Sequence, residues 1–520
     1  MTMLTRLQTG GLVIAAVLAW GSLFVVTARP AQAIPPAIEC TDLATPGLFP
    51  DTTVTTAEIV TSAGVENCRV AATISPTPDS MIGVEYRLPT DWNGKFLGLG
   101  GGGFGGSISP FGFNDPLQRG YAAAQTNIGH TPADGINWAL YPDGSPHHDR
   151  VTDYAWRSIE RMTVVGKMVV EAYYEQGPEI SYWRGCSTGG RQGLVMAQRF
   201  PDYYDGIIAG APVYTTRLQV RGNWEPTFLF APGGMALTEE TLDLISEYVV
   251  DRYDGMDGVE DGIIDDPTRL NSFDPAEIDE LTAEEVEIAR RMYEGPKLSD
   301  GTPVYPGRWP GSETQWPDAG GFNINGISPV MLRTMVKYDV NYDVFQFDLD
   351  ADLAEFDAAP VSDPEGNAHD PDIREFVGHG GKLLMYHGWN DGGPNPQSTI
   401  DYYEAVENVI GKDPDLRAGN PGNPADRVRE SVRLFMAPGM NHCGGGVGPN
   451  SFDTLTALEQ WYEEGIAPDS IIARNNQRDM ERPLCPYPLV ARYDGSGDTN
   501  DAENFNCVRG VGGGAGSQGG

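Results

Sequence analysis

The chain has 520 residues, of which 40% are hydrophobic and 21% are charged, and this composition excludes a disordered or collagen-like protein. A single hydrophobic core stops growing at roughly 250 to 300 residues, so the length predicts one large domain with an insertion or two to three ordinary domains. Lys and Arg number 35 against 73 Asp and Glu, which gives a net charge of −38. Nucleic acids and anionic membrane surfaces attract basic patches, so this charge argues against both kinds of partner.

The first 33 residues have the order of parts that is typical of a secretory signal peptide. Arg6 supplies a positive start, residues 11–26 form an apolar stretch, and Ala31-Gln32-Ala33 matches the small residues that signal peptidase recognises. The alternative is an uncleaved anchor helix, but about 16 apolar residues are short for a membrane span of roughly 20. We therefore expect a secreted or periplasmic mature chain that begins at Ile34 and has no membrane association.

Strands and helices alternate through the first half of the mature chain. The expected strands are 83–87, 96–99, 121–126 and 180–183, and the expected helices are 154–174 and 191–199. Such alternation predicts the mostly parallel sheet of an α/β fold. The same pattern returns in strands at 382–387 and 432–435, each followed by a Gly-rich loop. The predicted core therefore has two parts, residues 34–212 and 381–510.

The stretch between these two parts, residues 213–380, is helical and acidic. Helix starts are indicated by Thr238, by a capping box of Thr282 with Glu285 in a helix that ends at Gly295, and by Ser328 before Pro329. Because about 170 residues pass without the strand-helix alternation, we predict an inserted lid domain. Residues 511–520 are rich in Gly and predict a flexible tail.

A nucleophile motif lies between a predicted strand and a predicted helix. Gly185-Cys186-Ser187-Thr188-Gly189 fits the pattern G-x-S-x-G, which also arises by chance in a Gly-rich chain. Its context is more specific, because a strand-turn-helix arrangement pushes the serine Oγ out above the sheet on a sharp turn. A Cβ at either glycine would collide with the neighbouring strand or helix. Ser187 is therefore the candidate nucleophile.

A serine hydroxyl needs a base to remove its proton and an acid to orient that base. In α/β-hydrolases these partners follow the serine in the order Asp, His, each after a strand. Asp391 follows the strand at 382–387, and His442 follows the strand at 432–435. The six other histidines are expected to be loop, core or supporting residues: His130, His147, His148, His369, His379 and His387. The predicted triad is therefore Ser187, Asp391 and His442.

An even number of cysteines in an exported chain predicts disulfides. The sequence contains no C-x-x-C pair of the kind that would indicate a zinc site. Six cysteines allow fifteen connectivities. Short separations favour Cys40 with Cys68 and Cys485 with Cys507, which leaves Cys186 and Cys443. Cys186 precedes Ser187 and Cys443 follows His442, so a bond between them would hold the two catalytic residues together. The alternative is a buried free thiol at each position.

The oxyanion formed during ester cleavage needs two backbone N–H donors. The residue after the nucleophile, Thr188, supplies one, and the loop Gly100–Gly103 after an early strand is expected to supply the other. The sequence does not distinguish these glycines, and we take Gly102 to represent them. A dinucleotide-binding loop is the competing interpretation, but no acidic residue follows at the position that would hold a ribose.

Four segments together resemble the tannase and feruloyl esterase family, and the resemblance covers nearly the whole mature chain. They are residues 183–192 (WRGCSTGGRQ), 200–212 (FPDYYDGIIAGAP), 386–391 (YHGWND) and 441–443 (NHC). The resemblance implies an α/β-hydrolase with a large lid, the same triad and the disulfide between Cys186 and Cys443. Asn390 stands where many members have Ala, with no consequence expected for the triad.

The resemblance also implies a structural Ca²⁺ site in the lid, at residues 254–263 (DGMDGVEDGI). Asp254, Asp257 and Asp261 would bind through side chains, and Val259 and Ile263 through carbonyl oxygens. Ca²⁺ takes six to eight oxygen ligands, which such a loop can supply, although the spacing is not that of an EF-hand. The alternative is a chance cluster of acids in an acidic chain.

The function implied by the resemblance is a secreted serine carboxylic ester hydrolase that forms an acyl-enzyme with aromatic acids such as ferulic or gallic acid. The family also includes mono(2-hydroxyethyl) terephthalate hydrolase, and a free carboxylate on the substrate would need a cation such as Arg217, Arg221 or Arg333. Lid aromatics are candidates for stacking on the acyl ring or for the lid's own core: Trp224, Phe228, Trp309, Trp316 and Phe322. A non-catalytic binding protein on a hydrolase scaffold is an alternative of another class. The sequence makes no prediction of the oligomeric state.

Overall fold

The computed structural model describes residues 33–231, 234–270, 272–317, 323–362, 366–413 and 428–510. The apolar stretch of the predicted signal peptide, the lid residue Phe322 and the predicted tail 511–520 lie outside these ranges. Within them, no helix has both the length and the apolar character that a membrane span requires.

Within the described ranges, the largest sheet has nine strands in the order β1-β2-β3-β5-β4-β6-β7-β10-β11. Their bounds are β1 Thr52–Ser62, β2 Val65–Ile74, β3 Ile82–Pro89, β4 Lys95–Leu99, β5 Ala122–Thr126, β6 Ile180–Cys186, β7 Gly206–Gly210, β10 Lys382–Gly388 and β11 Val432–Ala437. The pairs from β5 to β11 are parallel, and the pairs from β1 to β5 are antiparallel. The predicted α/β fold with a mostly parallel sheet is confirmed.

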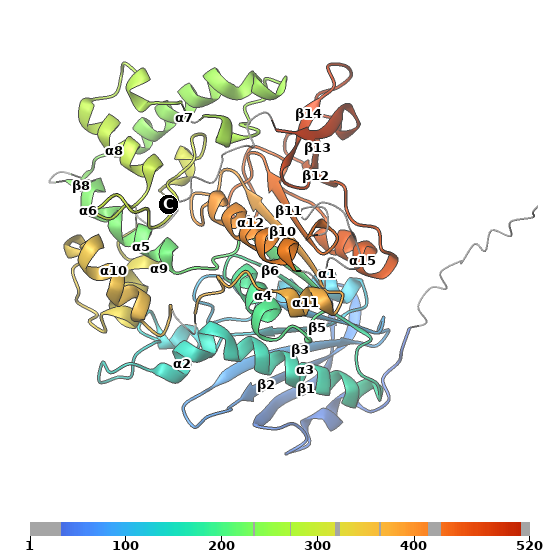
Figure 1. Cartoon of the computed structure of the whole chain (residues 1–520). Helices are drawn as coiled ribbons and strands as arrows, with labels where there is room; N and C mark the ends of the chain where they lie inside the picture. The colour runs from blue at the N-terminus through green and yellow to red at the C-terminus, as the bar shows by residue number, and fades with distance from the viewer. Residues whose placement is uncertain are drawn as a thin grey trace, which may run out of the picture. The chain divides into compact units, whose positions relative to one another are not determined.

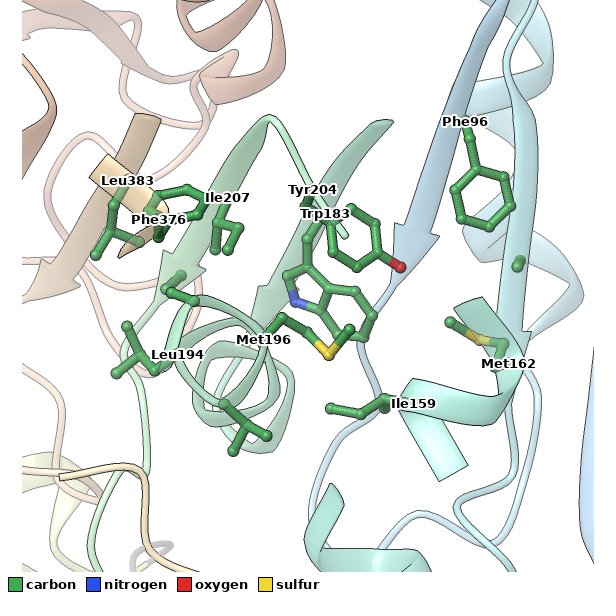
Figure 2. Close-up of a cluster of buried hydrophobic side chains, with 14 of the residues drawn as sticks. Phe96, Ile159, Met162, Trp183, Leu194, Met196, Tyr204, Ile207, Phe376 and Leu383 are labelled. Carbon is green, nitrogen blue, oxygen red and sulfur yellow. The ribbon is translucent and has the colours of Figure 1, made fainter. Parts of the chain in front are cut away.

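Helices cover both faces of this sheet, as a parallel sheet requires. The apolar side chains of α3 (Ser158–Tyr174), α4 (Thr188–Arg199), α11 (Arg374–Gly378) and α12 (Pro396–Lys412) share one buried cluster. In Figure 2, Trp183 and Ile207 from the strands meet Leu194 and Met196 of α4. The opposite face is covered by α1 (Asn114–Gln118) and α15 (Thr454–Glu464), which belong to a second cluster.

The helix predicted at 154–174 begins earlier and contains one wider turn. It starts as α2 (His148–Thr152), passes through a π-helical turn, η4 (Asp153–Arg157), and continues as α3. π-helical turns are uncommon and often lie at functional sites. Sequence periodicity does not reveal such a turn, because one added residue leaves the apolar pattern on either side intact.

The large sheet takes no described strand from the residues between β7 and β10, which fits an insertion. The insertion contains α5 (Arg217–Trp224), α6 (Pro226–Leu229), α7 (Glu239–Tyr253), α8 (Ala283–Glu294), α9 (Ile327–Met331) and α10 (Leu349–Ala358), with a short hairpin of β8 (Phe230–Ala231) and β9 (Gly234–Met235). Figure 1 shows these helices grouped on one side of the sheet. The predicted caps at Thr238 and Thr282 are both present.

Two details of the predicted lid differ from the structure. The helix α9 begins at Ile327, one residue before the predicted start at Ser328, and follows Gly326. Near the other end, Ala368, Ile373 and Phe376 pack in the cluster under the sheet, although they lie within the predicted lid range of 213–380. Apolar side chains of this segment face the core because α11 lies directly before β10. The predicted lid boundary at 380 itself stays a prediction.

Two regions of β structure were not predicted. Strand β1 carries Thr and charged residues at a largely exposed edge, so its pattern is weak. Strand β2 was missed although it alternates buried residues such as Val70 and Ile74 with more exposed ones. After α15, two antiparallel hairpins follow, formed by β12 (Ile471–Asn475) with β13 (Met480–Leu484) and by β14 (Leu489–Tyr493) with β15 (Phe505–Arg509). Cys40–Cys68 fastens the first region, and Cys485–Cys507 fastens the second, as the short separations predicted.

Candidate active site

Ser187 occupies the turn between β6 and α4 in a strained backbone conformation. Its φ of 62° lies in the left-handed region, which residues other than glycine rarely adopt. A Cβ on Gly185 would lie 2.4 Å from the carbonyl oxygen of Gly189, and a Cβ on Gly189 would lie 2.9 Å from the carbonyl oxygen of Gly101. The expected steric reason for both glycines is therefore present, and the turn has the geometry of a nucleophile elbow.

Asp391 and His442 come together from the loops after the neighbouring strands β10 and β11. The backbone N–H of Asn390 donates to the carbonyl of Met440 at 3.0 Å, so the two loops run side by side. His442 Nδ1 lies 2.7 Å from Asp391 Oδ2. The carboxylate is buried, whereas the imidazole is 39% exposed. With Nδ1–H donated to the carboxylate, Nε2 of His442 is left as the basic nitrogen.

The charges of this pair shift both pKa values. Burial raises the pKa of Asp391, but the positive imidazole of His442 and hydrogen bonds from His387 and His442 outweigh it and hold that pKa well below its usual range. Burial lowers the pKa of His442, and the Asp391 carboxylate outweighs this effect, so the pKa of His442 is raised above its ordinary value. Asp391 is therefore ionised and ready to stabilise a protonated His442.

His387 is a second imidazole on the same carboxylate. Its Nε2 lies 3.0 Å from Asp391 Oδ2 and 3.1 Å from the carbonyl oxygen of Pro394, and its Nδ1 lies 2.7 Å from Thr399 Oγ1. Because a carbonyl only accepts, Nε2 carries the hydrogen. His387 thus agrees with the expected supporting role. Its contact with Asp391 was not predicted, although its position four residues earlier, at the end of β10, is the signal that could have indicated it.

The structure pairs Cys186 with Cys443 across 257 residues of sequence. Together with the two disulfides described above, this completes the predicted pairing, and no described cysteine is free. The bond joins the residue before Ser187 to the residue after His442, so it links the two loops covalently. Ser187 and His442 also line the same cavity, which has a volume of about 310 Å³.

The glycine loop after β4 lies against the elbow. Two of its amides are already used, because Gly100 N–H donates to the Arg184 carbonyl at 2.9 Å and Gly101 N–H donates to Gln192 Oε1 at 3.0 Å. Within the described part of the chain, the amides of Gly102 and Gly103 donate no hydrogen bond. Gly103 lines the cavity, and its carbonyl accepts from Thr188 Oγ1 at 2.7 Å. The predicted donor Gly102 therefore has an equal candidate in Gly103.

The lid aromatics do not form the cavity wall. Trp316 is fully buried in a lid cluster, Trp309 packs against Trp389, and Trp224 packs against Phe228. None of these four lid residues is among the described residues that line the cavity. This agrees with their predicted alternative role as packing residues, and the described lining gives no support to a stacking role. A Trp or Phe on an amphipathic lid helix has the same sequence pattern in either role.

The described lining combines the predicted catalytic residues with apolar groups, uncharged polar groups and one arginine. It consists of Gly103, Tyr154, Ser187, Thr188, Val213, Leu218, Gln219, Arg221, Gly222, Gln315, Asn323, Gly326, Ile327, Ser328, Gly392, Gly393, Pro394 and His442. Tyr154 supplies the aromatic side chain, and it comes from η4 rather than from the lid. The sequence pattern places Tyr154 only at a helix start, because it does not indicate the π-helical turn that brings this residue to the cavity.

Of the three candidate lid arginines, the structure brings Arg221 to the cavity. Arg217 pairs with Asp357 at 2.7 Å, and Arg333 donates to backbone carbonyls of its own region. Arg221 is buried beside Glu225, and it donates to the carbonyls of Gly392 and Gly393. Arg308 also pairs with Glu225, at 2.9 Å, and donates to the Gly392 carbonyl. Two lid arginines thus hold the loop that follows Asp391.

The predicted calcium loop places its carboxylates near one another, and a fourth joins them. Asp257, Asp261, Ile263 and Asp265 line a small cavity of about 20 Å³, enough for a single small occupant. Burial raises the pKa of Asp257 to about 6, and Asp261 and Asp254 add to this effect by repulsion. Burial and repulsion from Asp257 raise the pKa of Asp265 well above its usual value. The sequence pattern did not indicate Asp265.

The same loop also makes bonds that need no metal. Asp254 accepts the backbone N–H of Gly262 at 2.8 Å and that of Ile263 at 3.1 Å. Asp261 accepts from Arg482 at 2.6 Å through Oδ2, while its buried Oδ1 has no hydrogen-bond partner. Within the described ranges, no three His, Cys, Asp or Glu side chains are arranged as ligands of one ion. The oxygen donors and the unpartnered Oδ1 suit Ca²⁺, and the site stays a prediction.

Comparison with known proteins gives the same assignment over most of the chain. A family model described as "Tannase and feruloyl esterase" matches residues 68–508. A probable feruloyl esterase of Arthroderma benhamiae is 33% identical over 86% of this chain and 87% of its own length. The mono(2-hydroxyethyl) terephthalate hydrolase of Piscinibacter sakaiensis is 32% identical over 85% of each chain.

Solved structures agree with this comparison. Feruloyl esterase B from Aspergillus oryzae matches with a TM-score of 0.80 and 26% identity, over 90% of this chain and 99% of that one. Tannin acyl hydrolase from Aspergillus niger shares the fold, with a TM-score of 0.71 and 21% identity over 92% and 94% of the two chains. With its sheet and the family match over residues 68–508, this chain belongs to the tannase and feruloyl esterase family of hydrolases.

Proposed function

We propose that the protein is a serine carboxylic ester hydrolase that acts on esters of aromatic, phenolic acids. The observation that carries the proposal is one cavity lined by both Ser187 and His442, with His442 bonded to a buried Asp391 at 2.7 Å. Nucleophile, base and orienting acid stand in the order that serine hydrolases of this fold use. A non-catalytic binding protein would have no need of a strained elbow or of an ionised carboxylate under a partly exposed imidazole.

In the proposed reaction, His442 Nε2 removes the proton from the Ser187 hydroxyl as Oγ attacks the ester carbonyl. The resulting oxyanion accepts hydrogen bonds from the backbone N–H of Thr188 and from that of Gly102 or Gly103. Collapse of this intermediate breaks the bond to the alcohol, which leaves with the proton from His442. A water then gives its proton to His442 and attacks the acyl-enzyme. Collapse of this second intermediate releases the acid, and His442 returns the proton to Ser187 Oγ.

The cavity chemistry favours feruloyl or galloyl groups over a terephthalate monoester. The lid side supplies uncharged polar groups, Gln219, Gln315, Asn323 and Ser328, which suit phenolic hydroxyl and methoxy groups. A terephthalate monoester carries a free carboxylate, which needs a cation. Arg221, the arginine on the described lining, is already engaged by Glu225 and by backbone carbonyls. The relatives named for these two activities are similarly close in identity, so the cavity carries this distinction.

We further propose export and a structural Ca²⁺. Three disulfides support an oxidising compartment, as does the signal-like pattern of residues 1–33. Asp254, Asp257 and Asp261 would hold the ion through side chains, with carbonyls of Val259 and Ile263. The carboxylates of Asp257, Asp261 and Asp265 beside the small cavity, and the unpartnered Oδ1 of Asp261, support a cation there. A bound Ca²⁺ would neutralise the repulsion among these carboxylates.

A panel of four esters tests the function: methyl ferulate, methyl gallate, mono(2-hydroxyethyl) terephthalate and a butyrate ester, each with the Ser187→Ala variant as blank. We expect kcat/KM for at least one phenolic ester to exceed that for butyrate by about tenfold or more. Preference for butyrate over all three aromatic esters would reject the substrate class. Failure of a fluorophosphonate to label Ser187 in the folded protein would reject the enzyme itself.

A further inference from the structure

Tyr154 lines the cavity, although aromatic contacts were expected to come from the lid. Of the residues described on the cavity lining, it is the one with a Phe, Tyr or Trp side chain. It is 7% exposed, so most of its ring is fixed by packing while part faces the cavity. It belongs to the π-helical turn η4, between α2 and α3.

The π-helical turn is held by a buried cation from the nucleophile helix. Arg191, in the first turn of α4, donates to the carbonyl of Tyr154 at 3.1 Å and to that of Ala155 at 2.8 Å. It also donates to the carbonyl of Gly366 at 3.0 Å. Arg191 is 4% exposed and forms no ion pair within the described ranges. Its guanidinium therefore binds the backbone of this turn. Because Arg191 lies four residues after Ser187, its side chain connects the turn to the start of the nucleophile helix.

The ring of Tyr154 is fixed on several sides. The Arg191 guanidinium carbon lies 4.8 Å from the ring centroid. Phe104 meets the ring edge to face with centroids 5.9 Å apart, and Trp138 lies 5.4 Å away at an angle of 50°. The Tyr154 hydroxyl also interacts with the buried Arg191 guanidinium. A ring held in this way presents a rigid aromatic surface to the cavity and needs no side-chain ordering when a ligand binds.

We propose that Tyr154 is the residue that determines specificity for an aromatic acyl group, through direct packing of its ring against the acyl ring. The inference rests on the proposed function. Aromatic pairs gain more than their buried area alone, whereas a flexible alkyl chain leaves gaps against a flat ring and loses contacts. Arg191 is the positioning residue, because it holds the turn that directs Tyr154 to the cavity.

The test compares three variants by the ratio of kcat/KM for methyl ferulate to kcat/KM for a butyrate ester. Tyr154→Leu removes the ring, and Tyr154→Phe keeps the ring and removes only the hydroxyl. Tyr342→Leu is the matched control. Tyr342 packs on the same apolar cluster as Tyr154, but it is not on the cavity lining. We expect Tyr154→Leu to lower the ratio about tenfold, mainly because kcat/KM for methyl ferulate falls. Tyr154→Phe and Tyr342→Leu should keep the ratio within about twofold.

The outcomes separate the inference from the proposed function. If the unmodified protein prefers ferulate and Tyr154→Leu leaves the ratio unchanged, the inference is wrong and the proposed function stands. If the unmodified protein prefers butyrate, the proposed function fails and the inference fails with it. Should Tyr154→Leu not fold, as judged by its thermal transition, the longer and more flexible Tyr154→Met replaces it, with the same expected loss of ratio. An equal loss of ratio in Tyr342→Leu would assign the effect to the cluster and overturn the inference.

Discussion

The two sides of the cavity are built differently. On the sheet side, Ser187, Asp391 and His442 follow the parallel strands β6, β10 and β11, of which β10 and β11 are neighbours. A disulfide links the first and last of their loops. On the lid side, polar groups such as Gln219 and Ser328 stand on short helices and bond to each other at 2.7 Å. The sheet side depends on strand register, and the lid side depends on local packing. The proposed catalytic groups therefore stand at strand ends, whereas the polar groups of the lid side depend on contacts between short helices.

The sharpest contrast between the two sides comes from single substitutions. Ser187→Ala removes the nucleophile and Asp391→Asn removes the charge that orients His442, so we expect kcat to fall by about 10⁴-fold or more in each. On the lid side, Gln219→Ala removes one polar contact and should change kcat/KM by about tenfold or less. Steady-state kinetics on methyl ferulate measure all three. A loss in Gln219→Ala as large as that in Asp391→Asn would break the comparison.

The disulfides give a second contrast, because two of them can be removed in turn. The double variant Cys186→Ala with Cys443→Ala should lose activity by about 100-fold, since a misplacement of about 1 Å between catalytic loops has an effect of this size. The matched control, Cys40→Ala with Cys68→Ala, should keep its kcat. In the chain-entropy model both variants lose stability by a similar amount, roughly 5 and 3.5 kcal/mol.

Thermal transitions and kcat together decide the role of this bond. If both double variants lose stability and neither loses activity below its transition temperature, the bond between Cys186 and Cys443 only stabilises the fold.

The pH profile tests the electrostatics of the sheet side. His442 must be neutral to accept the Ser187 proton, so kcat/KM should fall as pH drops through the pKa of His442. Because Asp391 raises that pKa, the acid limb should lie above the value of about 6.5 for a free imidazole. Asp391→Asn should move the limb to lower pH. A limb that does not move, or activity that stays constant down to pH 4 in the folded protein, would contradict the assigned pair.

Removal of metal should have the smallest effect on chemistry. EDTA is expected to lower the thermal transition by several degrees and to leave kcat at 25 °C within about twofold, because the Asp254 to Ile263 loop lies in the lid and donates nothing to the triad. Added Ca²⁺ should restore the transition, and Asp261→Asn should abolish this response. A transition that EDTA leaves unchanged would remove the metal site alone.

The difference between the two sides also explains how far the sequence predicts the structure. Strands β4, β6, β10 and β11 are short buried runs next to glycine loops, and their patterns placed them within a few residues. The residues of the proposed triad could be placed because each lies in the loop after such a strand. Strand β1 was missed because its exposed, Thr-rich pattern resembles a surface loop.

The cavity wall could not be predicted in the same way. Trp316 and Tyr154 are both aromatic residues in helical surroundings, yet Trp316 is fully buried and Tyr154 lines the cavity. The difference depends on a single π-helical turn and on Arg191, which contacts that turn from another helix. Asp265 was likewise missed, because contacts of the folded loop rather than sequence spacing bring it to the other carboxylates. Such contacts leave no periodic signal in the sequence.

The lid arginines that hold the loop after Asp391 have a consequence for exchanging lids between relatives. Arg221 and Arg308 belong to the lid, and the carbonyls they bind, at Gly392 and Gly393, belong to the core. A chimaera that receives a foreign lid without these side chains would leave buried carbonyls unpaired beside the catalytic acid. The natural unit of exchange is therefore the lid together with residues 391–395, and a graft that ends at β10 would change turnover as well as substrate preference.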